Sequence, residues 1–359
     1  MLRQGGFTLV EIMVGMVVAL LALLVIMQVF GSFEGQKRMT TGTADTQTSG
    51  ALALQSVLRE AQLAGFGMSA FDRRVRPMEC LSAVNAGSDP RIYSMAPVEI
   101  IDGGAGASDI LRVRYGTSMS GGAATRIGAI PGNYLSVDSN LGCQVGDTAI
   151  VSNGGNTCFI VSVEGLEPGV PTAVPPVLPK INLASPADAS VSLDDLPTVE
   201  AFVSCLGQYR EVMFAVNGDR LERDGEEVAS GIVNMQVQYG ISATPADTQI
   251  AQWVDSNGDW ANLSDQGAAD IDRRKRIKAV RVAIVARNPM RDREPVSEAC
   301  AQPADLANPA TGVCAWKNEP GSPAPVIDLS GTADWDHYRY RVLETIIPLR
   351  NVVWAKEAM

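Results

Sequence analysis

The sequence predicts an α+β protein in which one long N-terminal helix packs on a large antiparallel β-sheet head. Residues 7–30 form an apolar run with a single charged side chain, and residues 51–64 repeat apolar side chains at helical spacing. Most of the remaining chain contains short segments of alternating apolar and polar residues bounded by glycine and proline. With 359 residues, 46% of them hydrophobic, the chain can bury a substantial core.

The first element, residues 7–30, is long enough to cross a membrane. About 24 helical residues extend about 36 Å, whereas the hydrocarbon core of a bilayer is about 30 Å thick. A cleaved secretory signal would have an apolar region of only about 7 to 15 residues followed by a small-residue cleavage site, and this segment fits neither feature. We therefore expect a single membrane span that remains in the mature protein.

Glu11 is the charged residue inside this apolar run. An ionised carboxylate in hydrocarbon costs roughly a few kcal/mol, so Glu11 is a candidate functional residue that requires a compensating charge. Cleavage between Gly6 and Phe7 would create a free α-amine one helical turn away, and a neighbouring subunit could supply the same group. The alternative is a glutamate at the headgroup level that the helix N-terminal dipole favours.

The leader "MLRQGG", the junction "GG" followed by "FTLVE", and the long apolar run resemble the class III signal of type IV pilins and pseudopilins. This resemblance implies that residues 1–6 are a leader removed by a prepilin peptidase between Gly6 and Phe7, and that Phe7 is then N-methylated. It implies that Glu11 pairs with the amine of an adjacent subunit during filament assembly. It also implies a pilin-like lollipop fold, with half of the helix in the membrane and half on the head.

Residues 31–64 are expected to form a linker followed by the amphipathic half of the helix. Glycines at positions 31, 35, 42 and 50 each weaken a helix by about 1 kcal/mol relative to alanine, which predicts a flexible or partly melted segment. From residue 51 onward, apolar side chains at positions 54, 57, 58 and 61 form one face, which ends before the glycines of "GFG" at 65–67.

Residues 65–359 are expected to form the β-rich head. Alternating or apolar segments predict strands at 110–115, 147–152, 158–163, 233–241, 278–287 and 338–349. Asn217-Gly218 predicts a type I′ hairpin between two further strands. The basic cluster 272–276 is interpreted as the solvated start of a strand, and the Pro-rich stretch 170–180 as an extended surface connector.

The chain has six cysteines and no CxxC pair or Cys/His metal spacing: Cys80, Cys143, Cys158, Cys205, Cys300 and Cys314. An even number of dispersed cysteines behind a membrane segment indicates disulfides in an oxidising compartment, which places the bulk of the chain outside the cytoplasm. Six cysteines allow about fifteen connectivities. Loop closure favours the two close pairs, Cys143 with Cys158 and Cys300 with Cys314, and buried free thiols are the alternative.

Charge and composition exclude several functions. A net charge of −11 and a pI near 4.7 argue against nucleic acid as a direct partner. His337 is the single histidine, which removes Ser-His-Asp and multi-histidine metal sites, and we expect neither an enzyme nor a bound cofactor. Four tryptophans in polar surroundings form either a binding surface or half-buried plugs: Trp253, Trp260, Trp316 and Trp335.

One metal site is a hypothesis. Asp255, Asn257 and Asp259 occupy the first, third and fifth positions of a calcium-loop pattern. Trp260 replaces the usual glycine, however, and Gln266 stands where a bidentate glutamate belongs. The alternative is a polar turn between strands.

Several segments, taken in order, resemble the minor pilins of the PilW family: "LREAQLAGFGM", "SDILRVRYG", "GDTAIVSNGGNTCFIVSV", "VNGDRLERDGEEVASGIVNMQVQYGI" and "YRYRVLETIIPLRN". That family is similar to the J-type minor pseudopilins of type II secretion. The resemblance implies a structural subunit of the tip complex that primes type IV pilus assembly and supports twitching motility, attachment and DNA uptake. The long loops around 165–200 and 288–335 depart from the family pattern.

This resemblance also implies partners and a location. The expected partners are the prepilin peptidase, the major pilin, other minor pilins, the inner-membrane assembly platform and a tip adhesin. The head would lie in the periplasm of a Gram-negative bacterium before assembly and at the pilus tip afterwards. Two alternatives remain open: a minor pseudopilin of a type II secretion system, and an anchored surface adhesin that never enters a filament.

Overall fold

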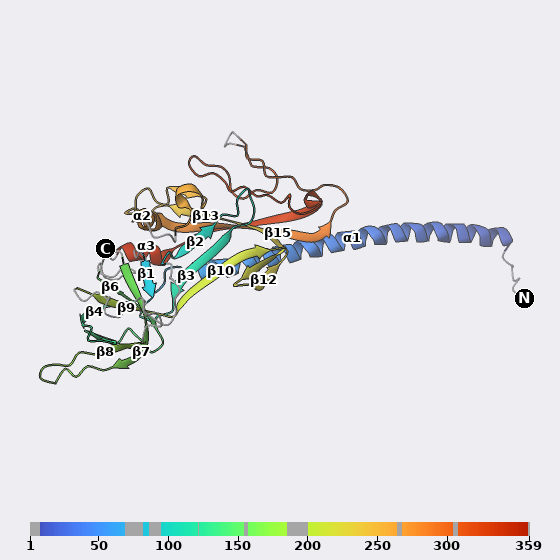
Figure 1. The fold of residues 1–359 in the computed structure, drawn as a ribbon. Helices are drawn as coiled ribbons and strands as arrows, with labels where there is room; N and C mark the ends of the chain where they lie inside the picture. The colour runs from blue at the N-terminus through green and yellow to red at the C-terminus, as the bar shows by residue number, and fades with distance from the viewer. Residues whose placement is uncertain are drawn as a thin grey trace, which may run out of the picture.

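The computed structural model describes residues 8–68, 82–85, 95–120, 122–153, 157–184, 200–263, 268–303 and 308–357. A single helix, α1 (Leu9–Ala61), leaves the head and extends well beyond it (Figure 1). Its first part, Leu9–Gly31, has a mean hydropathy of 2.9 and is entirely exposed, as expected for a helix that requires a membrane around it. The remaining chain forms a β-rich head, which confirms the predicted α+β lollipop fold.

The glycine-containing part of α1 was predicted to be flexible or melted, and this prediction is wrong. The helix is continuous from Leu9 to Ala61, and two of its glycines lie where it packs closely on the head. A β-carbon at Gly42 would lie 2.5 Å from Asn288 Oδ1, and one at Gly50 would lie 2.4 Å from Leu343 Cδ1. Four threonine hydroxyls of this part each donate a hydrogen bond to the carbonyl four residues earlier: those of Thr41, Thr43, Thr46 and Thr48.

Two antiparallel sheets form the centre of the head. The five-stranded sheet has the order β12 (Glu226–Ser230), β11 (Arg220–Arg223), β10 (Tyr209–Asn217), β3 (Ile110–Gly116) and β2 (Val98–Ile101). The four-stranded sheet has the order β14 (Gln252–Val254), β13 (Ile232–Ile241), β15 (Ile277–Arg291) and β16 (Tyr338–Pro348). One continuous core joins both sheets to the buried face of α1, including Val57, Phe214 and Tyr239. Burial of this shared core fixes the helix on the head.

The strands predicted from alternation are present in the structure, with small differences at their ends. The hairpin between β10 and β11 is also present, but its turn differs from the prediction. Asn217 pairs with Arg220, so the two-residue loop is Gly218-Asp219. Gly218 has a φ of 65°, whereas Asn217 and Asp219 are not among the positive-φ residues, so the turn is not type I′.

Residues 272–276 were predicted to be the solvated start of a strand, and this prediction is wrong. They belong to the short helix α2 (Ala268–Arg276), and β15 begins directly after it. Arg274 is buried and donates through Nε to the Leu263 carbonyl, and the Arg276 guanidinium lies 5.2 Å from the Trp260 ring. These contacts place the basic side chains against the protein, where their aliphatic stems pack.

The segment between β3 and β10 forms a second lobe that the sequence did not predict. Its strands are β4 (Ala124–Ala129), β5 (Tyr134–Val137), β6 (Thr148–Ser152), β7 (Thr157–Glu167), β8 (Lys180–Leu183) and β9 (Phe202–Gly207). They pair in the order β7, β6, β9, β4, β5 and β8, and β8 pairs back with β7. All six pairings are antiparallel, so the strands close into a barrel. A further strand, β1 (Ser82–Asn85), joins β7 in parallel.

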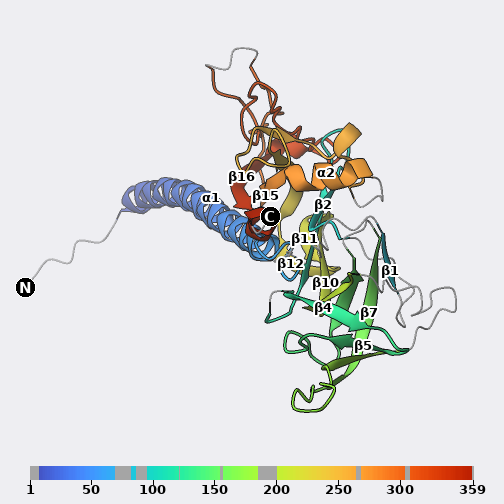
Figure 2. The same ribbon diagram turned by 90° about the vertical axis from the view of Figure 1, so that its left-hand side faces the viewer.

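The barrel has its own core and lies on the side of the head away from the N-terminus (Figures 1 and 2). The register of β3 and β10 pairs Gly116 with Tyr209, so the barrel begins and ends at two neighbouring positions of the central sheet. A smaller apolar cluster, including Met95, Ile160 and Leu206, packs one outer side of the barrel against the rest of the head. The barrel is therefore an insertion into the β3–β10 hairpin that is fixed to the sheet.

Residues 308–335 cover the face of the four-stranded sheet opposite α1. Val313, Ala315, Ile327 and Leu329 pack on Ala283 and Val285 of β15 in a separate apolar cluster. The helix α3 (Arg350–Glu357) follows β16, and Asn351 Nδ2 at its start donates to the Ala64 carbonyl just beyond α1. The four-stranded sheet thus lies between the helix and this long covering segment.

Candidate assembly site

The start of α1 holds Glu11 in a reciprocal cap with Thr8. Thr8 N and Thr8 Oγ1 each donate to Glu11 Oε2 at 3.0 Å, and Glu11 N donates to Thr8 Oγ1 at 3.3 Å. This is a capping box, which satisfies two backbone N–H groups that a helix start leaves open. No lysine or arginine of the described residues pairs with Glu11. The carboxylate therefore has hydrogen bonds but no opposite charge within the described chain.

The surface around Glu11 is apolar on every side of the helix. Large side chains of Leu9–Gly31 are at least half exposed, including Leu9 at 75%, Met27 at 68% and Phe30 at 70%. A helix that is hydrophobic all round and is not buried against the described head is suited to lipid or to other helices. Gly6 and Phe7, the predicted cleavage and methylation positions, lie outside the described residues.

Two family models match the chain. The model described as the prokaryotic N-terminal methylation motif matches residues 1–27, which contain Gly6, Phe7 and Glu11. The model described as type IV pilus-assembly protein W, PilW, matches residues 206–351, from the end of the barrel to α3. Together the two matches support a type IV pilin-like PilW protein. Searches of the curated proteins and of the solved structures find no match.

The match to PilW covers β10 to β16, and these strands supply much of the core on which α1 packs. One such contact was not predicted from the sequence. Glu60 on α1 is buried, pairs with Arg223 at 2.8 Å and accepts a hydrogen bond from Tyr115 Oη at 2.9 Å. Burial and the Glu60 hydrogen bond raise the pKa of Tyr115 to about 12, so its hydroxyl stays a donor at physiological pH. The sequence signal was a glutamate on the otherwise buried side of an amphipathic helix.

The three residues predicted to bind calcium do not all line the same cavity. Asp255 and Asn257 line a cavity of about 150 Å³ together with Asp102, Asp109 and Gln236. Asp259 does not line this cavity: its side chain is 86% exposed and forms an ion pair with Arg273 at 3.4 Å. In the described part of the chain, no group of three His, Cys, Asp or Glu side chains is arranged to hold a metal ion. Calcium binding stays a prediction.

Two carboxylates of this cavity have raised pKa values. Burial raises the pKa of Asp109 to about 7, although Val237 N and Gly103 N both donate to its carboxylate. Burial also raises the pKa of Asp255, whose Oδ1 accepts a 2.6 Å hydrogen bond from Gln238 Nε2. Mutual repulsion with Asp102 acts in the same direction for both. The cavity is thus acidic and partly buried, and three loops line it: residues 102–109, residues 255–257 and the loop at Val326.

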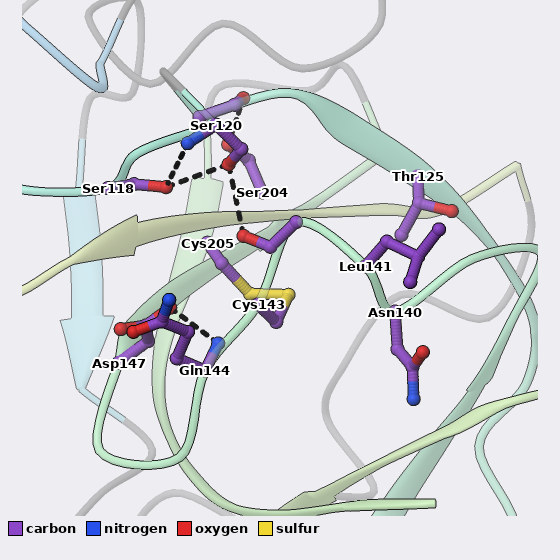
Figure 3. The surroundings of a disulfide bond; sticks show 12 residues. Ser118, Ser120, Thr125, Asn140, Leu141, Cys143, Gln144, Asp147, Ser204 and Cys205 are labelled. Atoms are coloured by element: carbon purple, nitrogen blue, oxygen red, sulfur yellow. Dashed lines mark hydrogen bonds between the residues drawn. A yellow bond between two sulfur atoms is a disulfide. The ribbon is translucent and has the colours of Figure 1, made fainter. Parts of the chain in front are cut away.

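The disulfides correct one predicted pairing and confirm another. Cys300 bonds with Cys314 as predicted, with a Cα–Cα distance of 4.8 Å. Cys143 bonds with Cys205, not with Cys158, with a Cα–Cα distance of 5.2 Å (Figure 3). The close spacing of 143 and 158 was misleading because β6 lies between them and closure of the barrel brings β9 beside the Cys143 loop. Cys158 is also disulfide-bonded, and Cys80 lies outside the described residues.

The tryptophans have structural contacts in the PilW-family head. The Arg281 guanidinium lies 5.0 Å from the Trp253 ring and 4.5 Å from the Trp316 ring, and Arg281 is almost fully buried. Arg281 Nε donates to Gln238 Oε1 at 2.6 Å, and a second nitrogen donates to the Pro323 carbonyl at 3.2 Å. Because Trp316 and Pro323 belong to the covering segment, this stack joins that segment to the sheet.

Proposed function

We propose that this protein is a minor pilin that joins a tip complex and primes assembly of a type IV pilus. The observation that carries the proposal is the combination of an N-terminal methylation motif, a fully exposed apolar helix and a PilW-matched head. The helix holds a carboxylate without an opposite charge in the described chain, which a subunit amine can provide. The protein acts by assembly, as a substrate of the prepilin peptidase and not as an enzyme.

The shape of the head supports a terminal position in the filament. A major pilin repeats many times in a helical lattice, so each head must fit closely between identical neighbours. This chain carries a whole barrel inserted into its central sheet, on the side away from the N-terminus (Figure 1). At the tip such a lobe meets few neighbours. The proposed partners are the major pilin, other minor pilins, the assembly platform and a tip adhesin, with attachment, twitching and DNA uptake as effects of the whole pilus.

The experiment that tests the proposal is the N-terminal mass of the protein from membranes with and without the prepilin peptidase. We expect a peptidase-dependent start at methylated Phe7. A retained "MLRQGG" in the presence of the peptidase contradicts the proposal and supports an anchored surface adhesin. Co-purification with a pilus secretin or with a type II secretin then separates the pilus subunit from a secretion pseudopilin.

A further inference from the structure

We propose that residues 168–179, called the finger, insert into an apolar groove with a basic rim on another protein at the outer end of the filament. The finger connects β7 to β8 and projects from the barrel (Figure 1). The inference rests on the proposed function for the location of its partner. The finger itself lies outside the PilW match, which begins at residue 206.

The finger has the composition of a binding segment and not that of an ordinary surface loop. Its sequence, PGVPTAVPPVLP, contains five prolines, four valine or leucine residues and no charge. Val174 is 98% exposed, Val170 is 47% and Val177 is 45% exposed. Proline restricts the conformations that a segment can adopt before it binds. An exposed Pro-rich segment therefore loses little conformational entropy on binding. Contiguous exposed apolar side chains of this kind mark interaction sites.

The base of the finger is held in a defined conformation. Glu167 and Lys180 face each other where the strands end and form an ion pair at 2.9 Å. Farther out, Val170 N donates to the Val177 carbonyl at 2.8 Å and Val177 N donates to the Val170 carbonyl at 3.1 Å. The finger is thus a short extension of the β7–β8 hairpin that presents Val174 at its end.

Charge indicates the kind of partner. The insertion, residues 117–208, contains eight acidic and two basic residues and so has a net charge of −6, more than half of the chain's −11. This charge repels nucleic acid and anionic lipid. The finger contains no aromatic or basic residue, the types that anchor a loop in a lipid headgroup region, and Lys180 is paired with Glu167. A neutral apolar finger on an acidic barrel is complementary to an apolar protein groove rimmed by lysine and arginine.

The test places a photoreactive amino acid at position 174 of the full-length chain in piliated cells, with position 119 as the control. Met119 is 94% exposed and lies at the base of the barrel, off the finger. We expect a protein adduct at position 174 in sheared pili, absent at position 119, whose linked peptide is apolar with lysine or arginine nearby. An adduct to lipid or nucleic acid, equal adducts at both positions, or no adduct at position 174 overturns the inference.

A second variant provides the quantitative readout. With the photoreactive group at position 170, Val174→Asp should reduce the adduct yield at least tenfold, while Val174→Thr should retain it. The side chains at positions 170 and 174 are exposed, so these variants should not change the amount of the chain in sheared pili. An unchanged adduct yield in Val174→Asp contradicts the inference. If the wild-type chain is missing from sheared pili, the proposed function fails, and the same cross-linking on intact cells still decides whether the finger binds a protein.

Discussion

Gly42 of α1 lies against Asn288 of β15 so closely that a β-carbon at position 42 would be 2.5 Å from the amide oxygen. Asn288 is buried, and its Oδ1 accepts a hydrogen bond from Met290 N at 2.9 Å. The side chain therefore cannot turn away without losing this bond. A glycine that appeared to weaken the helix is instead where the helix and the sheet come into contact.

Gly42→Ala should therefore destabilise the protein, although alanine favours a helix by about 1 kcal/mol over glycine. We expect a net loss of about 1 to 3 kcal/mol from overpacking, measured by thermal unfolding of the full chain in detergent. Gly31→Ala is the matched control, because a β-carbon at that position would meet nothing within 4 Å outside the local helix backbone among the described residues. Equal stability of the two variants would show that the helix does not pack closely at Gly42.

Glu11→Ala should leave membrane insertion intact and reduce incorporation of the protein into pili. The substitution removes both the capping box with Thr8 and the charge that an adjacent subunit's amine would neutralise. The measurement compares the amount of protein in membranes and in sheared pili. Glu11→Gln, which keeps the cap acceptor without the charge, should resemble Glu11→Ala if the charge matters. Normal incorporation of both variants would favour an adhesin that does not assemble.

Removal of the Cys143–Cys205 disulfide should cost more stability than removal of Cys300–Cys314. The first closes a sequence separation of 62 residues and the second one of 14 residues. The chain-entropy model gives about 4 kcal/mol and about 3 kcal/mol for loops of these lengths. Double serine variants and denaturant unfolding measure the two losses. Peptide mapping without reduction checks the connectivity, and a peptide linking Cys143 to Cys158 would contradict the structure.

Arg281→Lys should destabilise the covering segment, residues 308–335, although the charge is retained. Lysine cannot stack between Trp253 and Trp316 or donate to Gln238 and Pro323 with the same planar group. We expect a loss of about 1 to 3 kcal/mol and a red shift of tryptophan fluorescence as the rings become exposed. Arg220→Lys, at a half-exposed ion pair, should change neither quantity.

Asp109 should make the stability of the head depend on pH. Its folded pKa of about 7 lies above the ordinary value of about 3.9, so the folded protein holds a proton that the unfolded chain releases. Stability should fall as pH rises from about 4 to about 7, and Asp109→Asn should flatten this slope. An identical pH profile for the wild type and the variant would show that Asp109 is ionised throughout.

Calcium should raise the melting temperature if Asp255 and Asn257 bind it. The comparison uses the full chain in calcium and in chelator, with Asp255→Asn and Asp259→Asn as variants. Because Asp255 lines the acidic cavity and Asp259 does not, Asp255→Asn should abolish the shift while Asp259→Asn leaves it. An unchanged melting temperature of the wild type rejects the calcium hypothesis.

Local patterns were sufficient to predict both ends of α1 and most strands of the two central sheets. The alternation in β3 and β13 and the apolar run of β15 are properties of neighbouring residues, so the sequence displays them directly. The closed barrel could not be predicted in this way, although two of its strands, β6 and β7, were. β4, β5 and β8 contain four to six residues each, and their pairing joins segments that are distant in the chain.

The functional residues likewise include some that the local sequence reveals and others that depend on the tertiary structure. Glu11 and its leader form a local motif that the sequence displays completely. The Cys143–Cys205 bond, the contact of Glu60 with Arg223 and the cavity beside Asp255 depend on which strands become neighbours. Sequence spacing therefore favoured the nearer cysteine, Cys158, over the cysteine that barrel closure brings close.

The pairing of Gly116 with Tyr209 has a practical consequence for engineering. Opposed residues of antiparallel strands lie about 5 Å apart, so any domain whose own ends meet at that distance could be exchanged for the barrel without lengthening the connection. The residues that fix the helix to the sheets lie outside the exchanged segment. The same chain could thus serve as a membrane-anchored carrier that presents a foreign domain in place of the barrel.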